Sequence, residues 1–220
     1  MDYIKHIEDS LHWSNLEVSK LTQEIIDIHG LTSNKIKCFL NNICNIDGAT
    51  YLEIGVFRGS TFCSAIYGND IKAIGIDNWS SPFLMPSGVS QKMNFYIKDK
   101  GTDPKEDFLA NVKKFGKEGD VSVYRGNYLD FDYSTLDPID IVFYDGETKY
   151  YDQYTTIKKI IPYMSDNCIL IIDDWNWDKH AVTDALEESG CFINYQKSVI
   201  TSGEDSKDYW NGLGIFLIGK

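Results

Sequence analysis

From about residue 49 onward, short apolar runs alternate with amphipathic segments, and this alternation constrains the fold more than any other feature. The segment 104–116, for example, places Phe108, Val112 and Phe115 at helical spacing. Continuous apolar strands separated by helices predict a parallel sheet covered on both faces. The predicted strands are ATYLEIG (49–55), IKAIGID (71–77), VSVYRGN (121–127), IDIVFYDG (139–146), CILIIDDW (168–175), CFINYQKSVI (191–200) and GLGIFLIG (212–219).

The last two predicted strands are joined by a polar loop, 201–211, and no helix lies between them. A connection of this kind favours an antiparallel hairpin at the edge of the sheet. The sequence therefore predicts a doubly wound, Rossmann-like α/β fold. Its seven-stranded sheet is mostly parallel with a C-terminal antiparallel hairpin, and helices cover both faces.

Two amphipathic segments precede the first strand. The first predicts a helix over 15–29, ended by Gly30, and the second predicts a helix that starts at Ser33 or Asn34. We therefore expect an N-terminal helical extension or cap over 1–47, followed by the main domain over 48–220.

One connection within the main domain, 79–104, is long for a strand-to-helix link and holds three of the five prolines. It also carries apolar side chains, among them Phe83, Leu84 and Phe95. A long connection that can bury apolar surface favours an ordered lid insertion over a disordered linker.

Composition narrows the function classes. The formal net charge of -12 argues against binding nucleic acid through a general basic surface. The five cysteines form no C-x-x-C pair, which argues against a zinc site or a disulfide framework. No apolar run approaches the roughly 18 residues that span a bilayer, and the N-terminus does not resemble a signal peptide. We expect a soluble, cytoplasmic protein without nucleic-acid or membrane partners; whether it forms homo-oligomers stays open.

Two glycines, Gly55 and Gly59, follow the first strand in the stretch YLEIGVFRGSTF. Phe57 stands where a dinucleotide-binding loop has its middle glycine, and no lysine follows Gly59 as it would in a P-loop. Asp77 ends the second strand, where its carboxylate can accept both hydroxyls of a ribose. Glu53 adds a negative charge that suits a cationic ligand. The alternative, a tight strand-to-helix turn without a ligand, stays open.

The segments EIGVFRGS (53–60) and GID (75–77) resemble the motif pair of class I S-adenosylmethionine-dependent methyltransferases, and the resemblance extends from about residue 48 onward. It implies that the loop binds the methionine and ribose portion of S-adenosylmethionine. It also implies that Asp77 binds the ribose hydroxyls and that RGNYLD (125–130) flanks the adenine. The implied cofactor-binding residues are Glu53, Gly55, Val56, Phe57, Gly59, Ser60, Thr61, Asp77, Asn78, Asn127, Tyr128 and Asp145.

Three carboxylates follow two of the apolar strands. Asp145 ends the fourth strand, and Asp173 and Asp174 end the fifth. Adjacent strands lie about 4.8 Å apart, so these side chains would repel one another unless a cation lay between them. Mg²⁺, or another hard divalent cation, prefers such oxygen ligands. The alternative is that these residues cap helices or lie on exposed loops.

The stretches YDGETKYYDQYTTIKKIIP (144–162) and ILIIDDW (169–175) resemble metal-dependent O-methyltransferases of the catechol and macrocin types. The resemblance implies that Asp145, Asp173 and Asp174 hold the metal beside the acceptor hydroxyl. The related pattern Asp-Gly-Asp-His is here Asp-Gly-Glu-Thr, so the candidates for a general base are Lys149 and His180.

The resulting hypothesis is a divalent-metal-dependent O-methyltransferase acting on a small hydroxylated molecule, such as a sugar or a natural product. Two alternatives are a methyltransferase-fold protein that binds the cofactor or a nucleoside without methylating, and a nicotinamide-dependent oxidoreductase. The oxidoreductase would require a phosphate-binding glycine loop, which the sequence lacks. Four tryptophans are candidates either for stacking on a ligand or for ordinary packing. They are Trp79, Trp175, Trp177 and Trp210.

Overall fold

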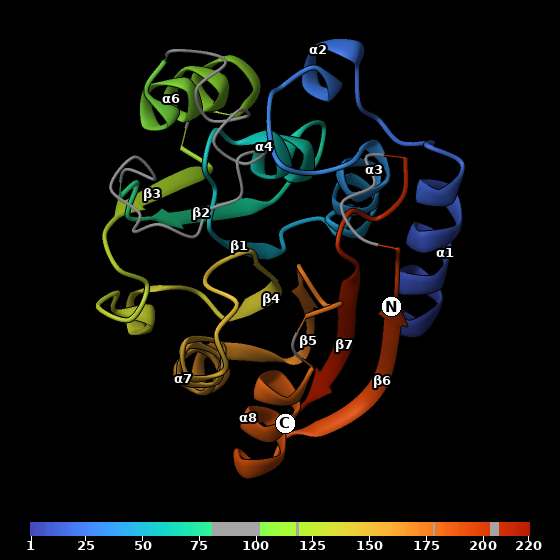
Figure 1. The fold of residues 1–220 in the computed structure, drawn as a ribbon, viewed down its shortest axis with the longest axis vertical. Coiled ribbons are helices and arrows are strands. Elements are labelled where there is room, and N and C mark those ends of the chain that lie inside the picture. Colours follow the sequence, from blue (N-terminus) through green and yellow to red (C-terminus); the bar gives the residue numbers. More distant parts are fainter. Residues whose placement is uncertain (81–101, 118, 178, 203–206) are drawn as a thin grey trace.

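A single seven-stranded sheet forms the centre of the computed structural model, which describes residues 1–80, 102–117, 119–177, 179–202 and 207–220 (Figure 1). The strand order is β3-β2-β1-β4-β5-β7-β6. All pairs among β1 to β5 are parallel, and β7 is antiparallel to both β5 and β6. The predicted fold class is confirmed. The strands are β1 (Thr50–Ile54), β2 (Lys72–Asp77), β3 (Val121–Arg125), β4 (Ile139–Tyr144), β5 (Met164–Ile172), β6 (Phe192–Val199) and β7 (Leu213–Gly219).

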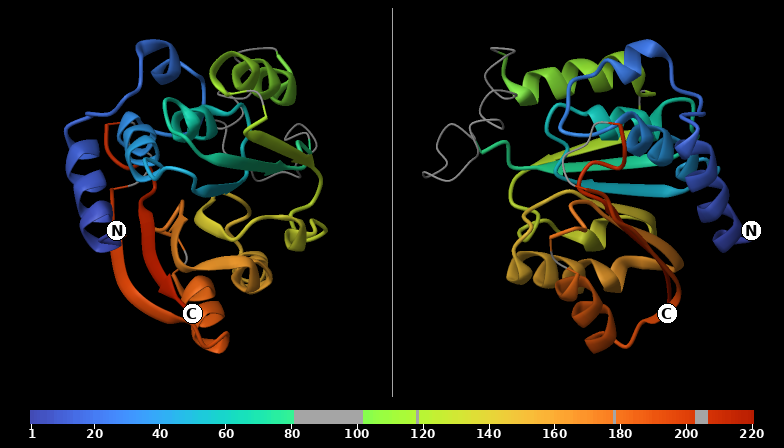
Figure 2. Two further views of the ribbon diagram at one scale, coloured as in Figure 1. Left: turned by 180° about the vertical axis from the view of Figure 1, so that it is seen from behind. Right: turned by 45° about the vertical axis from the view of Figure 1, so that its right-hand side comes forward.

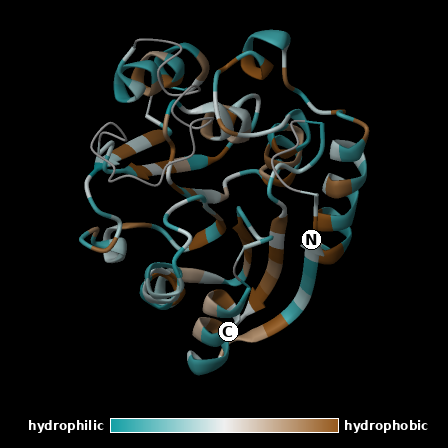
Figure 3. Ribbon diagram, in the orientation of Figure 1, coloured by the Kyte–Doolittle hydropathy of each residue, from teal (hydrophilic) through white to brown (hydrophobic). Residues whose placement is uncertain are grey.

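The sheet separates two apolar clusters because side chains along a strand alternate between its faces. On β4, Ile141 and Phe143 belong to one cluster, whereas Val142 and Tyr144 belong to the other. Helices α1, α3, α4 and α6 cover the first face, and α7 and α8 cover the second (Figures 1 and 2). Figure 3 shows hydrophobic residues concentrated in the strands between these two layers. The helices are α1 (Tyr3–Asn15), α2 (Gln23–Ile26), α3 (Asn34–Ile43), α4 (Ser60–Ile66), α6 (Pro104–Phe115), α7 (Tyr150–Ile160) and α8 (His180–Glu188), with 3-10 turns η2 (Tyr133–Thr135) and η3 (Ile161–Tyr163).

The N-terminal helices differ in part from the prediction. The helix α3 begins after the N-cap Ser33, as expected, but the predicted helix over 15–29 is wrong. The helix α1 ends at Asn15, and of the remainder only the four residues of α2 are helical. The cause is Lys20, which lies between these helices. Its backbone N–H donates to Asn41 Oδ1 at 2.9 Å, and its Nζ donates to Asn45 and Asn69 at 2.7 Å each. These long-range contacts hold the chain across α3 and override the local periodicity.

The helices α1 and α3 contribute to the apolar core on one face of the sheet, since Ile7, Leu11 and Phe39 belong to the same cluster as Ile141. The division of the chain at residue 47 stays a prediction. Most of the predicted lid, 79–104, lies outside the described residues; Trp79, Ser80 and the residues from Thr102 onward are described. None of the helices in the described part of the chain is long and apolar enough to cross a membrane.

Candidate functional site

The glycine loop connects β1 to α4 at the carboxyl end of the sheet. Gly55, Phe57 and Gly59 all have positive φ angles, of 89°, 45° and 83°. A Cβ added at Gly55 would lie 1.9 Å from the carbonyl oxygen of Asp145, at the end of the neighbouring β4. Gly55 is therefore required by the backbone of the fold itself, and approach of a ligand is not needed to explain it.

Glu53 lies on β1 directly before this loop and is fully buried. Its carboxylate accepts hydrogen bonds from the hydroxyls of Tyr51 and Thr61, the latter at 2.6 Å. Burial raises the pKa of Glu53 to about 8, an increase that the two hydrogen bonds reduce and the nearby Asp77 reinforces. Within the described residues, Glu53 thus meets hydroxyl groups and no basic side chain.

The buried Glu53 leads to a prediction about pH. Because its folded-state pKa is raised above the ordinary 4.5, the folded state keeps a proton between pH 4.5 and 8 that the unfolded state releases. Its contribution to stability therefore falls as pH rises through this window, by about 1.4 kcal/mol per pH unit for one full proton. Urea unfolding from pH 5 to 8.5 should show a smaller decline for Glu53→Gln than for the wild type. Parallel curves for the two proteins would show that Glu53 titrates normally.

Asp77 ends β2 beside the loop, and both of its carboxylate oxygens accept hydrogen bonds from backbone N–H groups. Phe57 N–H donates to Oδ2 at 2.8 Å, and Trp79 N–H donates to Oδ1 at 2.7 Å. Burial raises the pKa of Asp77, and these hydrogen bonds oppose the increase. Backbone groups of Val56 and Asn78 also lower the pKa of this carboxylate through hydrogen bonds, and the ribose contact stays a prediction. Its neighbour Asn78 is exposed, and the Asn78 Oδ1 accepts from Ser80 N–H at 2.8 Å.

Three other residues predicted to contact the cofactor direct their side chains into the protein. Val56 is 1% exposed and belongs to the core. Ser60 Oγ donates to the carbonyl of Ile28 at 3.0 Å, and Thr61 Oγ1 donates to Glu53. A cofactor would therefore meet the backbone of these residues rather than their side chains.

The predicted adenine segment follows β3 and lies beside Asp77, because Gly126 N–H donates to the Asp77 carbonyl at 3.0 Å. Asn127 is exposed, and its Oδ1 accepts from Leu129 N–H at 2.9 Å. The Tyr128 ring lies 6.2 Å from that of Tyr144, edge to face.

The structure places the backbone of the predicted carboxylate residues at the ends of neighbouring strands. Asp145 N–H donates to Ile54 O at 2.8 Å, and Asp173 N–H donates to Tyr144 O at 3.0 Å. Burial raises the pKa of both carboxyl groups well above the ordinary range. Asp173 and Asp174 raise the pKa of Asp145 further, and Asp174 raises that of Asp173. Asp173 Oδ1 is buried and has no hydrogen-bond partner among the described residues.

Asp174 has a left-handed backbone, with φ of 55°, and is positioned by a residue that the sequence analysis missed. Asn211, which is 3% exposed, donates from Nδ2 to Asp174 Oδ1 at 2.8 Å. No motif in the sequence signals this contact. Within the described ranges, the His, Cys, Asp and Glu side chains form no group of three that could hold a metal ion.

The candidate bases lie at the surface, and two of the candidate tryptophans differ in exposure. Lys149 is 75% exposed, with its Nζ 3.3 Å from Glu147 Oε2, and His180 is the exposed first residue of α8. Trp175 is 1% exposed and donates from Nε1 to Ser198 Oγ at 2.8 Å, so it belongs to the core. Trp177, by contrast, is 59% exposed and follows the carboxylates.

Comparisons with known proteins agree with this fold. A family model described as a methyltransferase domain matches residues 52–175. An O-methyltransferase from Bacillus cereus, solved with S-adenosylhomocysteine, is 13% identical with a TM-score of 0.55, over 97% of this chain and 90% of that chain. A methyltransferase from Podospora anserina, also bound to S-adenosylhomocysteine, is 12% identical with a TM-score of 0.54, over 98% and 87%. No curated protein matches the sequence.

The similarity to solved structures shows the fold. The family model shows the family, because the match spans more than half of the chain and includes both the glycine loop and Asp77. The chain belongs to the class I S-adenosylmethionine-dependent methyltransferases.

Proposed function

We propose that this methyltransferase transfers its methyl group to a hydroxyl oxygen of a small molecule, such as a sugar or a natural product, with the help of a divalent cation. The observation that carries the proposal is Asp173 Oδ1, which is buried and has no hydrogen-bond partner in the part of the chain that the structure describes. It lies in a cluster with Asp145 and Asp174, in which burial raises the pKa of Asp145 and of Asp173 and the Asp174 carboxylate raises both further. Such a cluster is costly unless protons or a cation neutralise it.

The donor chemistry of the cluster fits a hard cation, since Mg²⁺ prefers carboxylate oxygens. Asp145, Asp173 and Asp174 would hold it, and a bound cation would favour the ionised form of the acceptor hydroxyl. Because no group of three described side chains is already placed to hold a metal ion, we expect binding to draw these carboxylates together.

The chain's own residues would place the donor beside this cluster. The Gly55 backbone lies against the backbone carbonyl of Asp145, so the loop proposed to hold S-adenosylmethionine adjoins the strand end that carries this proposed metal ligand. Methyl transfer then depends mainly on alignment of the acceptor oxygen with the sulfonium methyl. Lys149 and His180 remain the candidates for taking up the hydroxyl proton, and both are exposed.

The direct test is a turnover assay with S-adenosylmethionine and a panel of hydroxylated sugars, phenols and natural products. We expect formation of S-adenosylhomocysteine with at least one acceptor, a decrease of about tenfold or more with a chelator, and recovery with Mg²⁺. Equal turnover with and without the chelator would rule out the cation. Absence of S-adenosylhomocysteine binding at millimolar concentration would contradict the cofactor assignment itself.

A second candidate function is binding of the cofactor without methylation. It is favoured by the surroundings of Lys149, whose ammonium pairs with Glu147 at the surface, and by Thr148, which stands where the related pattern has histidine. Binding of S-adenosylhomocysteine without turnover of any acceptor in the panel would support this candidate, and one methylated product would exclude it.

A further inference from the structure

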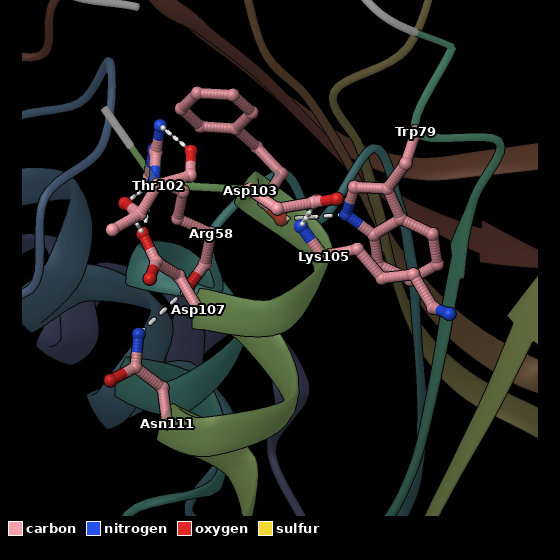
Figure 4. Close-up of polar contacts among 8 residues, drawn as sticks. Arg58, Trp79, Thr102, Asp103, Lys105, Asp107 and Asn111 are labelled. Carbon is pink, nitrogen blue, oxygen red and sulfur yellow. Dashed lines mark hydrogen bonds and ion pairs between the residues drawn. The ribbon is translucent and has the colours of Figure 1, made fainter. Parts of the chain in front are cut away.

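Arg58 is a charged residue of the glycine loop, yet only 2% of it is exposed. Its guanidinium donates to the carboxylate of Asp107, to Thr102 Oγ1 at 2.8 Å and to Thr102 O at 3.1 Å (Figure 4). Asn111 Nδ2 donates to the backbone carbonyl of Arg58 at 2.9 Å. We call Arg58, Thr102, Asp107 and Asn111 the Arg58 clasp. It fixes both the side chain and the backbone of Arg58 to α6 and to the residues that immediately precede this helix.

Burial of the Arg58 side chain has a cost in free energy. Burying a guanidinium costs desolvation energy, and Arg58 Nε is buried without a hydrogen-bond partner among the described residues. An apolar side chain could fill the same volume without that cost. A guanidinium differs from an apolar chain in its rigid planar fork, which fixes the direction of several hydrogen bonds at once. Compared with an apolar side chain, Arg58 therefore provides hydrogen bonds in fixed directions.

Phe57, the residue before Arg58, has the backbone conformation that these hydrogen bonds help to hold. Phe57 has a φ of 45°, a conformation that costs about 1–2 kcal/mol for a residue other than glycine. Its N–H donates to Asp77 at 2.8 Å, and its carbonyl accepts from Trp79 Nε1 at 2.8 Å. Strained conformations persist only where the surroundings fix them from several sides. Here Asp77 and Trp79 hold the loop from β2, and the Arg58 clasp holds it from α6.

We propose that Arg58 is a positioning residue for S-adenosylmethionine: the Arg58 clasp keeps the loop from Gly55 to Gly59 in the conformation that binds the cofactor. Arg58 acts through the loop, and its side chain need not touch the cofactor. A loop that is already ordered does not lose conformational entropy when the ligand binds, so losing the clasp should weaken binding. The proposal rests on the cofactor and is independent of the acceptor and of the cation.

The test measures binding of S-adenosylhomocysteine to the full chain by isothermal titration calorimetry. We expect Arg58→Met to raise the Kd about tenfold, the effect of losing charge-assisted hydrogen bonds. Arg58→Lys keeps the charge but loses the fork, so it should also weaken binding. Thr102→Val removes one hydroxyl from an exposed position and should raise the Kd about threefold. In the Arg58→Met background, Thr102→Val should add nothing, because the two residues act as a unit.

The matched control is Lys114→Met, which removes another ion pair of α6, with Glu24 at 3.4 Å, away from the loop. It should leave the Kd unchanged. A merely structural defect lowers the fraction of protein that binds, and so the stoichiometry, without changing the Kd. Unchanged Kd values in the Arg58 variants, or a wild-type Kd for Arg58→Lys, would overturn the proposal. If Arg58→Met does not fold, an unchanged Kd in Thr102→Val overturns it. Failure of the wild type to bind would instead contradict the cofactor assignment.

Discussion

Replacing Gly55 with alanine is expected to destabilise the protein by about 3–5 kcal/mol and to abolish cofactor binding. Two costs add at this position. The φ of 89° is unfavourable for any residue with a Cβ, and the new Cβ would lie 1.9 Å from the carbonyl oxygen of Asp145. That oxygen belongs to the backbone at the end of β4, so it cannot move aside as a flexible side chain could. Urea unfolding would give the loss of stability, and calorimetry with S-adenosylhomocysteine would give the loss of binding.

Gly48→Ala provides the matched control. Gly48 also has a positive φ, of 75°, but a Cβ there would meet nothing within 4 Å. Gly48→Ala should therefore destabilise the protein only through the backbone conformation, by about 1–2 kcal/mol, and should leave cofactor binding intact. Equal destabilisation by the two substitutions would mean that contact with Asp145 does not restrict Gly55.

Replacing Asp173 with asparagine should have opposite effects on stability and on activity. The raised pKa of Asp173 means that its folded state favours the protonated form, so its contribution to stability falls as pH rises above the ordinary carboxylate range. Asparagine removes that charge and should raise the free energy of unfolding of the metal-free protein at pH 8. The same change removes a proposed metal ligand, so methyl transfer should fall about 100-fold or more.

Unfolding of the metal-free protein and turnover with Mg²⁺ would measure the two effects separately. Mg²⁺ should raise the melting temperature of the wild type and have no effect on Asp173→Asn. Asp166→Asn is the control, because Asp166 is an exposed residue near the start of the same strand. An Asp173→Asn protein with wild-type turnover would contradict the proposed role of the carboxylates.

The strands around the candidate site could be predicted because two local signals agree at each of them. An apolar run gives the strand, and a glycine or aspartate at its end marks where the chain leaves the sheet, as at Gly55, Asp77 and Asp145. The helix over 15–29 failed because its apolar spacing was the only signal. Lys20, whose partners lie in later segments, decided the conformation there instead.

The contacts that position the site residues could not be predicted, because each joins residues far apart in the chain. Arg58 and Asp107 are separated by 49 positions, and Asn211 and Asp174 by 37. Neither pair has a characteristic spacing, and asparagine and arginine are ordinary surface residues. The sequence therefore indicates residue types suited to the chemistry, whereas the direction of their side chains depends on tertiary packing.

The position of β7 has a consequence for how the protein reaches its fold. This strand is the last in the chain, yet it lies between β5 and β6, and all seven of its residues are buried. Until β7 pairs, β5 presents an open edge and β6 has no neighbour in the sheet. Open edges of apolar strands invite pairing with other chains. Docking of residues 213–219 therefore joins β5 to β6 and covers the apolar edges that would otherwise be open to pairing with other chains.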